Sequence, residues 1–182
     1  MTIKAVNKLY NIDFPHRQIV TGDGFCMSKI MLIGEAPGRE EVEQGKPFVG
    51  KAGKNLSEFL EILQLKREHI FITNTVKFRP TKTSEFNTIS NRTPTEAEIK
   101  QFLPYLLMEI KIICPQIIVT LGNTPLRALL GNNVTVGKLH GALNYFEDKK
   151  LYPLYHPASI IYNPSLKSVY LKDVENLKNY LV

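Results

Sequence analysis

The sequence has very little cysteine and no long run of apolar residues. Cys26 and Cys114 are the two cysteines among 182 residues, too few for a disulfide framework or for a metal site made of thiolates alone. No stretch of about 18 apolar residues is present, so no segment is predicted to span a bilayer. The first residues also lack the apolar core of a signal peptide. We therefore expect a cytoplasmic protein with no membrane partner.

The residues that are present indicate a globular domain. Hydrophobic residues make up 43% and charged residues 22% of the chain, which excludes a disordered or collagen-like protein. The length of 182 residues predicts a single domain over 1–182. The formal net charge of +6 permits a polyanionic partner without requiring one. We expect the protein to be a monomer.

Apolar runs alternate with helical patterns along the chain. The runs are continuous and rich in β-branched residues, as is typical of buried parallel strands. Between and after them, apolar residues recur at helical spacing, and Thr95 with Glu98 fits a capping box. This alternation predicts an α/β fold with a largely parallel sheet. The predicted strands are 30–33, 70–73, 117–121 and 152–155, and the predicted helices are 54–65, 95–114, 124–130 and 166–181.

The segment 79–93 breaks this rhythm. It reads RPTKTSEFNTISNRT, which is polar and shows no clear period. We predict a long loop there, and loops longer than about 12 residues in compact domains are usually functional or mobile.

Chemically useful residues follow the ends of the predicted strands. Glu35 follows the first strand, Asn74 the second, Gly122 the third and His156 the fourth. Ligands of open α/β sheets bind beyond the carboxyl ends of the strands, so a carboxylate, an amide, a glycine turn and an imidazole are expected at one edge. Each of these residues taken alone has an ordinary structural explanation, and their joint occurrence is the argument for a site.

The motifs around these residues resemble those of family 4 uracil-DNA glycosylases, in the same order. The resemblance runs from about residue 29 to the end of the chain. It implies a three-layer α/β/α fold around a central four-stranded, largely parallel sheet. It also implies that the protein is a monofunctional DNA glycosylase that removes uracil from DNA. The motifs are GEAPG (34–38), GKPFVGKAG (45–53), NTVKFRP (74–80), NRTP (91–94), LGNT (121–124) and HPAS (156–159).

The resemblance assigns roles to residues of the base pocket. Phe48 would stack on a uracil that has left the duplex, because the target base cannot be reached inside the stack. Asn74 would read the uracil edge by donating to O4 and accepting from N3–H. Ala36 would support the pocket through its backbone, and Glu41 would crowd the C5 position and reject thymine.

The resemblance also implies the catalytic groups and the DNA contacts. His156 would donate to O2, where negative charge grows as the base departs. Glu35 would hold or activate water, or stabilise the sugar cation, and the sequence leaves these alternatives open. Basic residues would contact phosphates, and the HPAS motif would lie against the DNA. The DNA-contact candidates are Lys51, Lys77, Arg79, Lys138, Gly122, Asn123, Pro157, Ala158 and Ser159.

The sequence departs from the family at the iron–sulfur cluster. Family 4 enzymes usually hold the cluster through four cysteines, and none of the four is present here. Phe78 and Phe102 occupy two of the positions, and no CxxC occurs near Tyr10. We therefore predict that the protein has no cofactor and no metal. We also predict that Phe78 and Phe102 pack together with apolar residues from the N-terminus.

Other functions remain open at this point. One alternative is a glycosylase for another deaminated or mismatched base. A second is a DNA-binding relative that has lost catalysis. A nucleotide-binding α/β protein fits poorly, because the glycine-rich stretch after the first strand is not followed by the GK[ST] of a P-loop.

Overall fold

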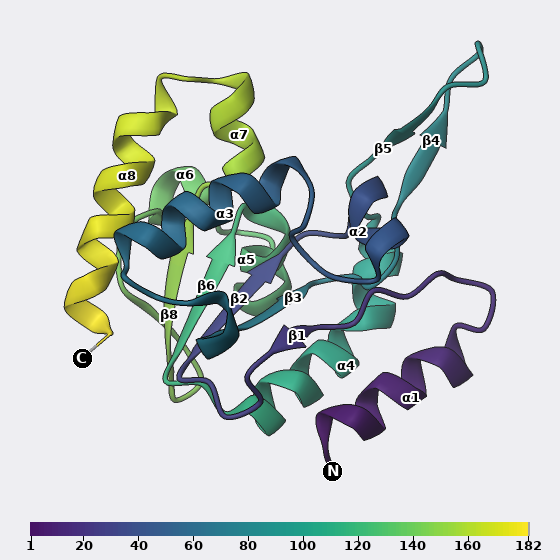
Figure 1. The fold of residues 1–182 in the computed structure, drawn as a ribbon, viewed down its shortest axis with the longest axis horizontal. Helices are drawn as coiled ribbons and strands as arrows, with labels where there is room; N and C mark the ends of the chain where they lie inside the picture. The colour runs from purple at the N-terminus through teal and green to yellow at the C-terminus, as the bar shows by residue number, and fades with distance from the viewer. Residues whose placement is uncertain (182) are drawn as a thin grey trace.

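A central sheet organises the chain (Figure 1). The computed structural model describes residues 1–181, without the side chains of Lys51, Ala52 and Asn55. Strand order is β1-β3-β2-β6-β8-β7. Four strands pair in parallel in the middle, and a short antiparallel strand is added at each edge. The parallel strands are β2 (Ile30–Gly34), β3 (Phe71–Asn74), β6 (Ile117–Leu121) and β8 (Lys149–Leu154); the edge strands are β1 (Asp23–Gly24) and β7 (Asn144–Phe146).

The predicted four parallel strands are confirmed, but the sheet is wider than predicted. In the described residues it has six strands, because β1 and β7 complete its edges. These two strands are only two and three residues long. Neither strand is a continuous apolar run, because β1 reads DG and β7 reads NYF, and no residue of either strand is fully buried. Strands of this kind leave little signal in a single sequence.

Helices cover both faces of the sheet and form the predicted three layers (Figure 1). In β2, Ile30 and Leu32 face one cluster, while Met31 and Ile33 face the other. This alternation explains why the strand reads as continuously apolar, since both faces of a covered parallel sheet are buried. The first face is covered by α3 (Lys51–Ile62) and α8 (Leu166–Leu177); the second is covered by α1 (Ile3–Asp13) and α4 (Glu96–Ile113).

Helix α4 begins where the sequence predicts it. The Thr95 hydroxyl accepts a hydrogen bond from the Glu98 amide at 3.2 Å, and the Glu98 carboxylate accepts one from the Thr95 amide at 2.8 Å. The predicted capping box is therefore confirmed.

Helix α1 is held against α4 by aromatic rings, and this helix was not predicted. The rings of Phe14 and Phe102 stack with centroids 4.3 Å apart, and the Phe78 ring lies 5.5 Å from Phe102. Val6 and Tyr10 of α1 complete this buried cluster. The predicted packing of Phe78 and Phe102 with N-terminal apolar residues is confirmed.

The segment 79–93 is not an irregular loop as predicted. It contains a β-hairpin of β4 (Thr81–Thr83) and β5 (Ile89–Asn91). The hairpin projects from the body of the molecule (Figure 1), and the Phe86 side chain near its tip is 90% exposed. Its strands have almost no buried residues, so they show no apolar period in the sequence.

Shorter helices connect these elements. None of the helices in the described chain combines the length and hydropathy that crossing a membrane would require. The remaining helices are α2 (Arg39–Gln44), α5 (Asn123–Leu130), α6 (Val136–Leu139), α7 (Pro157–Tyr162) and the 3-10 helices η1 (Arg67–His69) and η2 (Lys178–Tyr180).

Candidate active site

The carboxyl ends of the parallel strands meet at one edge of the sheet. Gly34 at the end of β2 pairs with Asn74 of β3, and Leu121 of β6 pairs with Leu154 of β8. Two adjoining hollows open at this edge, a cleft of about 930 Å³ and a smaller pocket of about 360 Å³. Glu35 and His156 line both. The predicted convergence of strand-end residues is confirmed.

Phe48 and Asn74, which line the smaller pocket, pack against Gly34. A Cβ on Gly34 would lie 2.5 Å from the Phe48 ring and would also overlap the Asn74 side-chain oxygen. Any larger residue would therefore fill the space that the Phe48 ring and the Asn74 amide share. Asn74 is buried, and the Phe48 and His156 ring centroids are 6.2 Å apart. Ala36 also lines this pocket.

The loop that carries Phe48 is held by two charged residues. The Glu41 carboxylate accepts hydrogen bonds from the backbone amides of Gly38, Val49 and Gly50 at 2.8–3.1 Å. Glu41 is therefore engaged in bracing the loop. The Arg67 guanidinium donates to the Phe48 carbonyl at 3.1 Å and to the Pro47 carbonyl. Phe48 itself has a φ of 54°, a left-handed conformation that the surrounding bonds must maintain.

Arg67 was missed by the sequence analysis. It lies 19 residues from Phe48 along the chain, and no motif connects the two. Burial lowers the pKa of the Arg67 guanidinium.

One ring nitrogen of His156, Nδ1, is engaged in a hydrogen bond, which leaves Nε2 to carry the proton of the neutral ring. His156 caps α7, and its Nδ1 accepts a hydrogen bond from the Ala158 amide at 3.1 Å. The neutral ring must then carry its proton on Nε2. Burial lowers the pKa of His156 to about 4, so this neutral form is present at neutral pH. Gly122 (φ 87°) lies against the histidine, because a Cβ there would be 3.2 Å from the His156 Cβ.

Glu35 is paired with a hydroxyl that the sequence analysis did not single out. The Thr124 Oγ1 donates to Glu35 Oε2 at 2.5 Å. Burial raises the pKa of Glu35, and the hydrogen bond from Thr124 opposes that shift. The site therefore holds a poorly solvated carboxyl group and a neutral imidazole that line the same pockets. Such an arrangement suits water activation or stabilisation of a developing cation.

Four of the nine predicted DNA-contact residues lie at the cleft. Gly122, Asn123, Ala158 and Ser159 line it. Arg79 is half-buried and donates to the Asn91 side chain at 2.7 Å, while Lys138 is exposed on α6. Pro157 is buried in the first turn of α7, and its contact with DNA stays a prediction. Lys51 begins α3, but its side chain lies outside the described residues.

Lys77 is the clearest correction. Its side chain is 0% exposed, and its ammonium forms an ion pair with Glu109 at 2.9 Å. A buried and paired ammonium cannot reach a phosphate, so the predicted phosphate contact is wrong. The sequence pattern placed Lys77 near the site correctly but could not show which way the side chain turns.

The residues of the chain do not fit an iron–sulfur cluster. Both cysteines are exposed and free, Cys26 after β1 and Cys114 at the end of α4. Aromatic rings fill the space between α1 and α4. Within residues 1–181, no group of three or more histidine, cysteine or acidic side chains is arranged to hold a metal.

Comparison with known proteins identifies the superfamily. The sequence model of the uracil DNA glycosylase superfamily matches residues 22–178, and the chain belongs to this superfamily. The type-4 uracil-DNA glycosylase of Saccharolobus solfataricus is 42% identical, with 91% of this chain and 77% of that protein covered. The enzyme of the same name from Sulfurisphaera tokodaii is 39% identical over 90% of this chain and 74% of its own length.

A solved structure supports the fold. The chain resembles Pedobacter heparinus SMUG2 with a TM-score of 0.56, and the match covers 97% of this chain and 82% of that one. The sequence identity is 14%, so this likeness concerns the fold alone.

Proposed function

We propose that this protein excises uracil from DNA by hydrolysing the N-glycosidic bond, as a monofunctional glycosylase of base excision repair. The observation that carries the proposal is the meeting of Phe48, Asn74, Glu35 and His156 at one pocket. The activity named for its relatives supports the same reaction. The whole chain, 1–182, would act as one domain.

Recognition of the base would rest on Phe48 and Asn74. The uracil ring would leave the duplex and stack on Phe48 above Gly34. The Asn74 amide would donate to O4 and accept from N3–H. Cytosine presents the reverse pattern at these two atoms, and leaving buried polar groups unpaired is costly. Ala36 would close the pocket wall. Glu41, which also lines the pocket, would crowd the C5 position against thymine and would brace the Phe48 loop.

Hydrolysis would use His156 and Glu35. The bond between C1′ and N1 breaks, and the electron pair leaves with uracil as negative charge on its ring. The Nε2–H of neutral His156 would donate to O2 as this charge grows, which is worth roughly 3 kcal/mol for one well-placed donor. Water forms the new bond to C1′ and loses a proton, which neutralises the departing uracil anion. Ionised Glu35 would orient that water or stabilise the sugar cation.

DNA would be held at the rim of the cleft. Arg79 and Lys138 would contact phosphates, as would Lys51, and Gly122, Asn123, Ala158 and Ser159 would lie against the strand. We propose that the reaction needs no metal or cluster. The two free, exposed cysteines support this.

A cleavage assay tests the proposal. Labelled oligonucleotides with one uracil, single-stranded or opposite G or A, are incubated with the protein and then treated with alkali to break abasic sites. We expect cleavage at uracil, with a rate that falls sharply but stays measurable in Asn74→Ala. Parallel strands with hypoxanthine or a thymine mismatch test the alternative bases. Binding without cleavage of any strand would instead identify a non-catalytic DNA-binding relative.

A further inference from the structure

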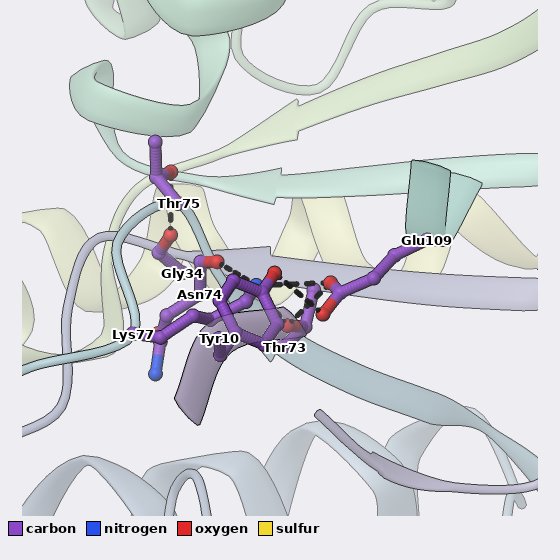
Figure 2. A network of polar contacts seen from close by, with 7 residues as sticks. All are labelled: Tyr10, Gly34, Thr73, Asn74, Thr75, Lys77 and Glu109. Atoms are coloured by element: carbon purple, nitrogen blue, oxygen red, sulfur yellow. Dashed lines mark hydrogen bonds and ion pairs between the residues drawn. The ribbon is translucent and has the colours of Figure 1, made fainter. Parts of the chain in front are cut away.

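A buried polar network lies directly behind Asn74 (Figure 2). Its centre is the Lys77 ammonium, which donates to the Asn74 carbonyl at 2.5 Å, to Thr73 Oγ1 at 2.6 Å and to Glu109 Oε2 at 2.9 Å. Thr73 also donates to Glu109 Oε2 at 2.9 Å, and Tyr10 donates to Glu109 Oε1 at 3.0 Å. The network thus joins α1, β3 and α4.

The peptide groups around Asn74 are held from two sides. On one side, the Thr75 amide and hydroxyl both donate to the Gly34 carbonyl, at 2.8 and 2.9 Å. On the other side, the Lys77 ammonium donates a hydrogen bond to the backbone carbonyl of Asn74. Gly34 packs against the side chains of Phe48 and Asn74, so these bonds fix the position of Asn74, the residue expected to read the base, relative to Gly34.

Stability alone is a weak reason to bury this ion pair. Removing an ammonium and a carboxylate from water carries a desolvation penalty that often exceeds their attraction, and apolar replacements of such pairs are often neutral or stabilising. Burial accordingly lowers the pKa of the Lys77 ammonium, and Glu109 opposes the shift. What an apolar pair could not supply is a donor aimed at the Asn74 carbonyl.

We propose that Lys77, oriented by Glu109 and Tyr10, is a positioning residue that sets the Asn74 amide for base recognition. The inference rests on the proposed function, because it concerns the residue that would read uracil. Lys77 acts through Asn74 and touches neither DNA nor the reacting atoms. Displacing a recognition group by about 1 Å can lower a rate by up to about 100-fold, so a small loss of order at Asn74 has a large effect.

The central test replaces both charges together, as Lys77→Met with Glu109→Gln, so that no unpaired charge is left buried. We expect single-turnover uracil excision to fall about tenfold or more. The affinity for DNA that already carries an abasic site stays the same, because no base is read there. In an Asn74→Ala background the same double replacement causes little further loss, since its effect passes through Asn74.

A milder variant and a control keep the test decisive. Tyr10→Phe retains the ring contacts of α1 and removes one donor to Glu109, so it lowers excision in the same direction but less. Ser28→Ala removes a buried hydroxyl that bonds the Ile30 and His69 carbonyls, at the opposite end of the sheet. This control loses stability without losing excision. Excision at the wild-type rate in the double variant, or an undiminished loss in the Asn74→Ala background, would refute the proposal.

A readout without catalysis separates this inference from the proposed function. The side-chain amide signals of Asn74 in an NMR spectrum are identified by their disappearance in Asn74→Ala. We expect them to shift or broaden in the Lys77→Met, Glu109→Gln protein and to stay in place in Ser28→Ala. Unmoved signals refute the positioning role. A wild-type protein that removes no uracil refutes the proposed function. The NMR comparison would still show whether Lys77 and Glu109 position the Asn74 amide.

Discussion

Two titratable side chains of the cleft are shifted in opposite directions by the same cause. Burial disfavours the charged form of each, so it raises the pKa of the Glu35 carboxyl and lowers that of His156 to about 4. His156 is therefore neutral at every pH well above 4. The acidic limit of activity should therefore report Glu35 and not His156.

Thr124→Val tests this assignment. The Thr124 hydroxyl stabilises the charged form of Glu35, and its removal should raise the pKa of Glu35 further. The proposed mechanism uses the ionised Glu35 carboxylate, so the acidic limb of the pH profile should move to higher pH. Single-turnover rates across pH measure the shift. Thr120→Val is the control, because within the described residues the Thr120 hydroxyl has no hydrogen-bond partner. A profile that is the same in both variants would remove Thr124 from the mechanism.

The absence of a side chain at Gly34 allows Phe48 and Asn74 to pack closely at the pocket. Gly34→Ala should place a methyl group against the Phe48 ring and the Asn74 amide, and so exclude the base. We expect uracil excision to fall about 100-fold, the loss that small misplacements at a reacting centre produce. Gly137→Ala is the control, because a Cβ there meets only the Tyr155 hydroxyl at 3.9 Å. Comparable activity of the two alanine variants would contradict this account of the pocket.

At the scale of elements, helix α4 contributes its N-terminus, the aromatic cluster and Glu109 to the region around the site. Its first turn depends on the capping box of Thr95 and Glu98. Thr95→Ala should lower the free energy of unfolding by about 1 kcal/mol. Chemical denaturation measures the change. Thr83→Ala, on an exposed hairpin strand, should alter it much less, and equal losses would argue against the cap.

The aromatic cluster and the hairpin give contrasting expectations for the same substitution. Phe102 is fully buried among the rings of Phe14 and Phe78, so Phe102→Ala should lower the free energy of unfolding by about 3–5 kcal/mol. Phe86 on the hairpin is almost fully exposed, and Phe86→Ala should change it by no more than about 0.5 kcal/mol. Thermal melting of the two variants makes the comparison. A large loss from Phe86→Ala would mean that the hairpin packs against the body.

At the scale of the molecule, the sequence predicted what regular patterns encode. The four parallel strands, helix α4 with its cap, and the gathering of Glu35, Asn74 and His156 followed from apolar periodicity and from strand-end positions. The edge strands and the hairpin escaped because short or exposed elements leave little apolar pattern. The contacts of Lys77 and Arg67 could not be predicted for another reason. The direction of a long side chain depends on partners distant in sequence, here Glu109 and the Phe48 carbonyl.

The net charge of +6 gives a prediction for the molecule as a whole. If Arg79, which donates to Asn91 of the cleft, contacts a phosphate, its replacement by alanine should weaken DNA binding and reduce the slope of log K against log salt concentration by about one. Affinities for uracil-free DNA at several salt concentrations measure this slope. Lys178→Ala is the control, because Lys178 lies on η2 and pairs with Glu175. That variant lowers the net charge by the same amount. An equal change in both slopes would show that the affinity for DNA depends on the overall charge of the protein and not on a contact at the cleft.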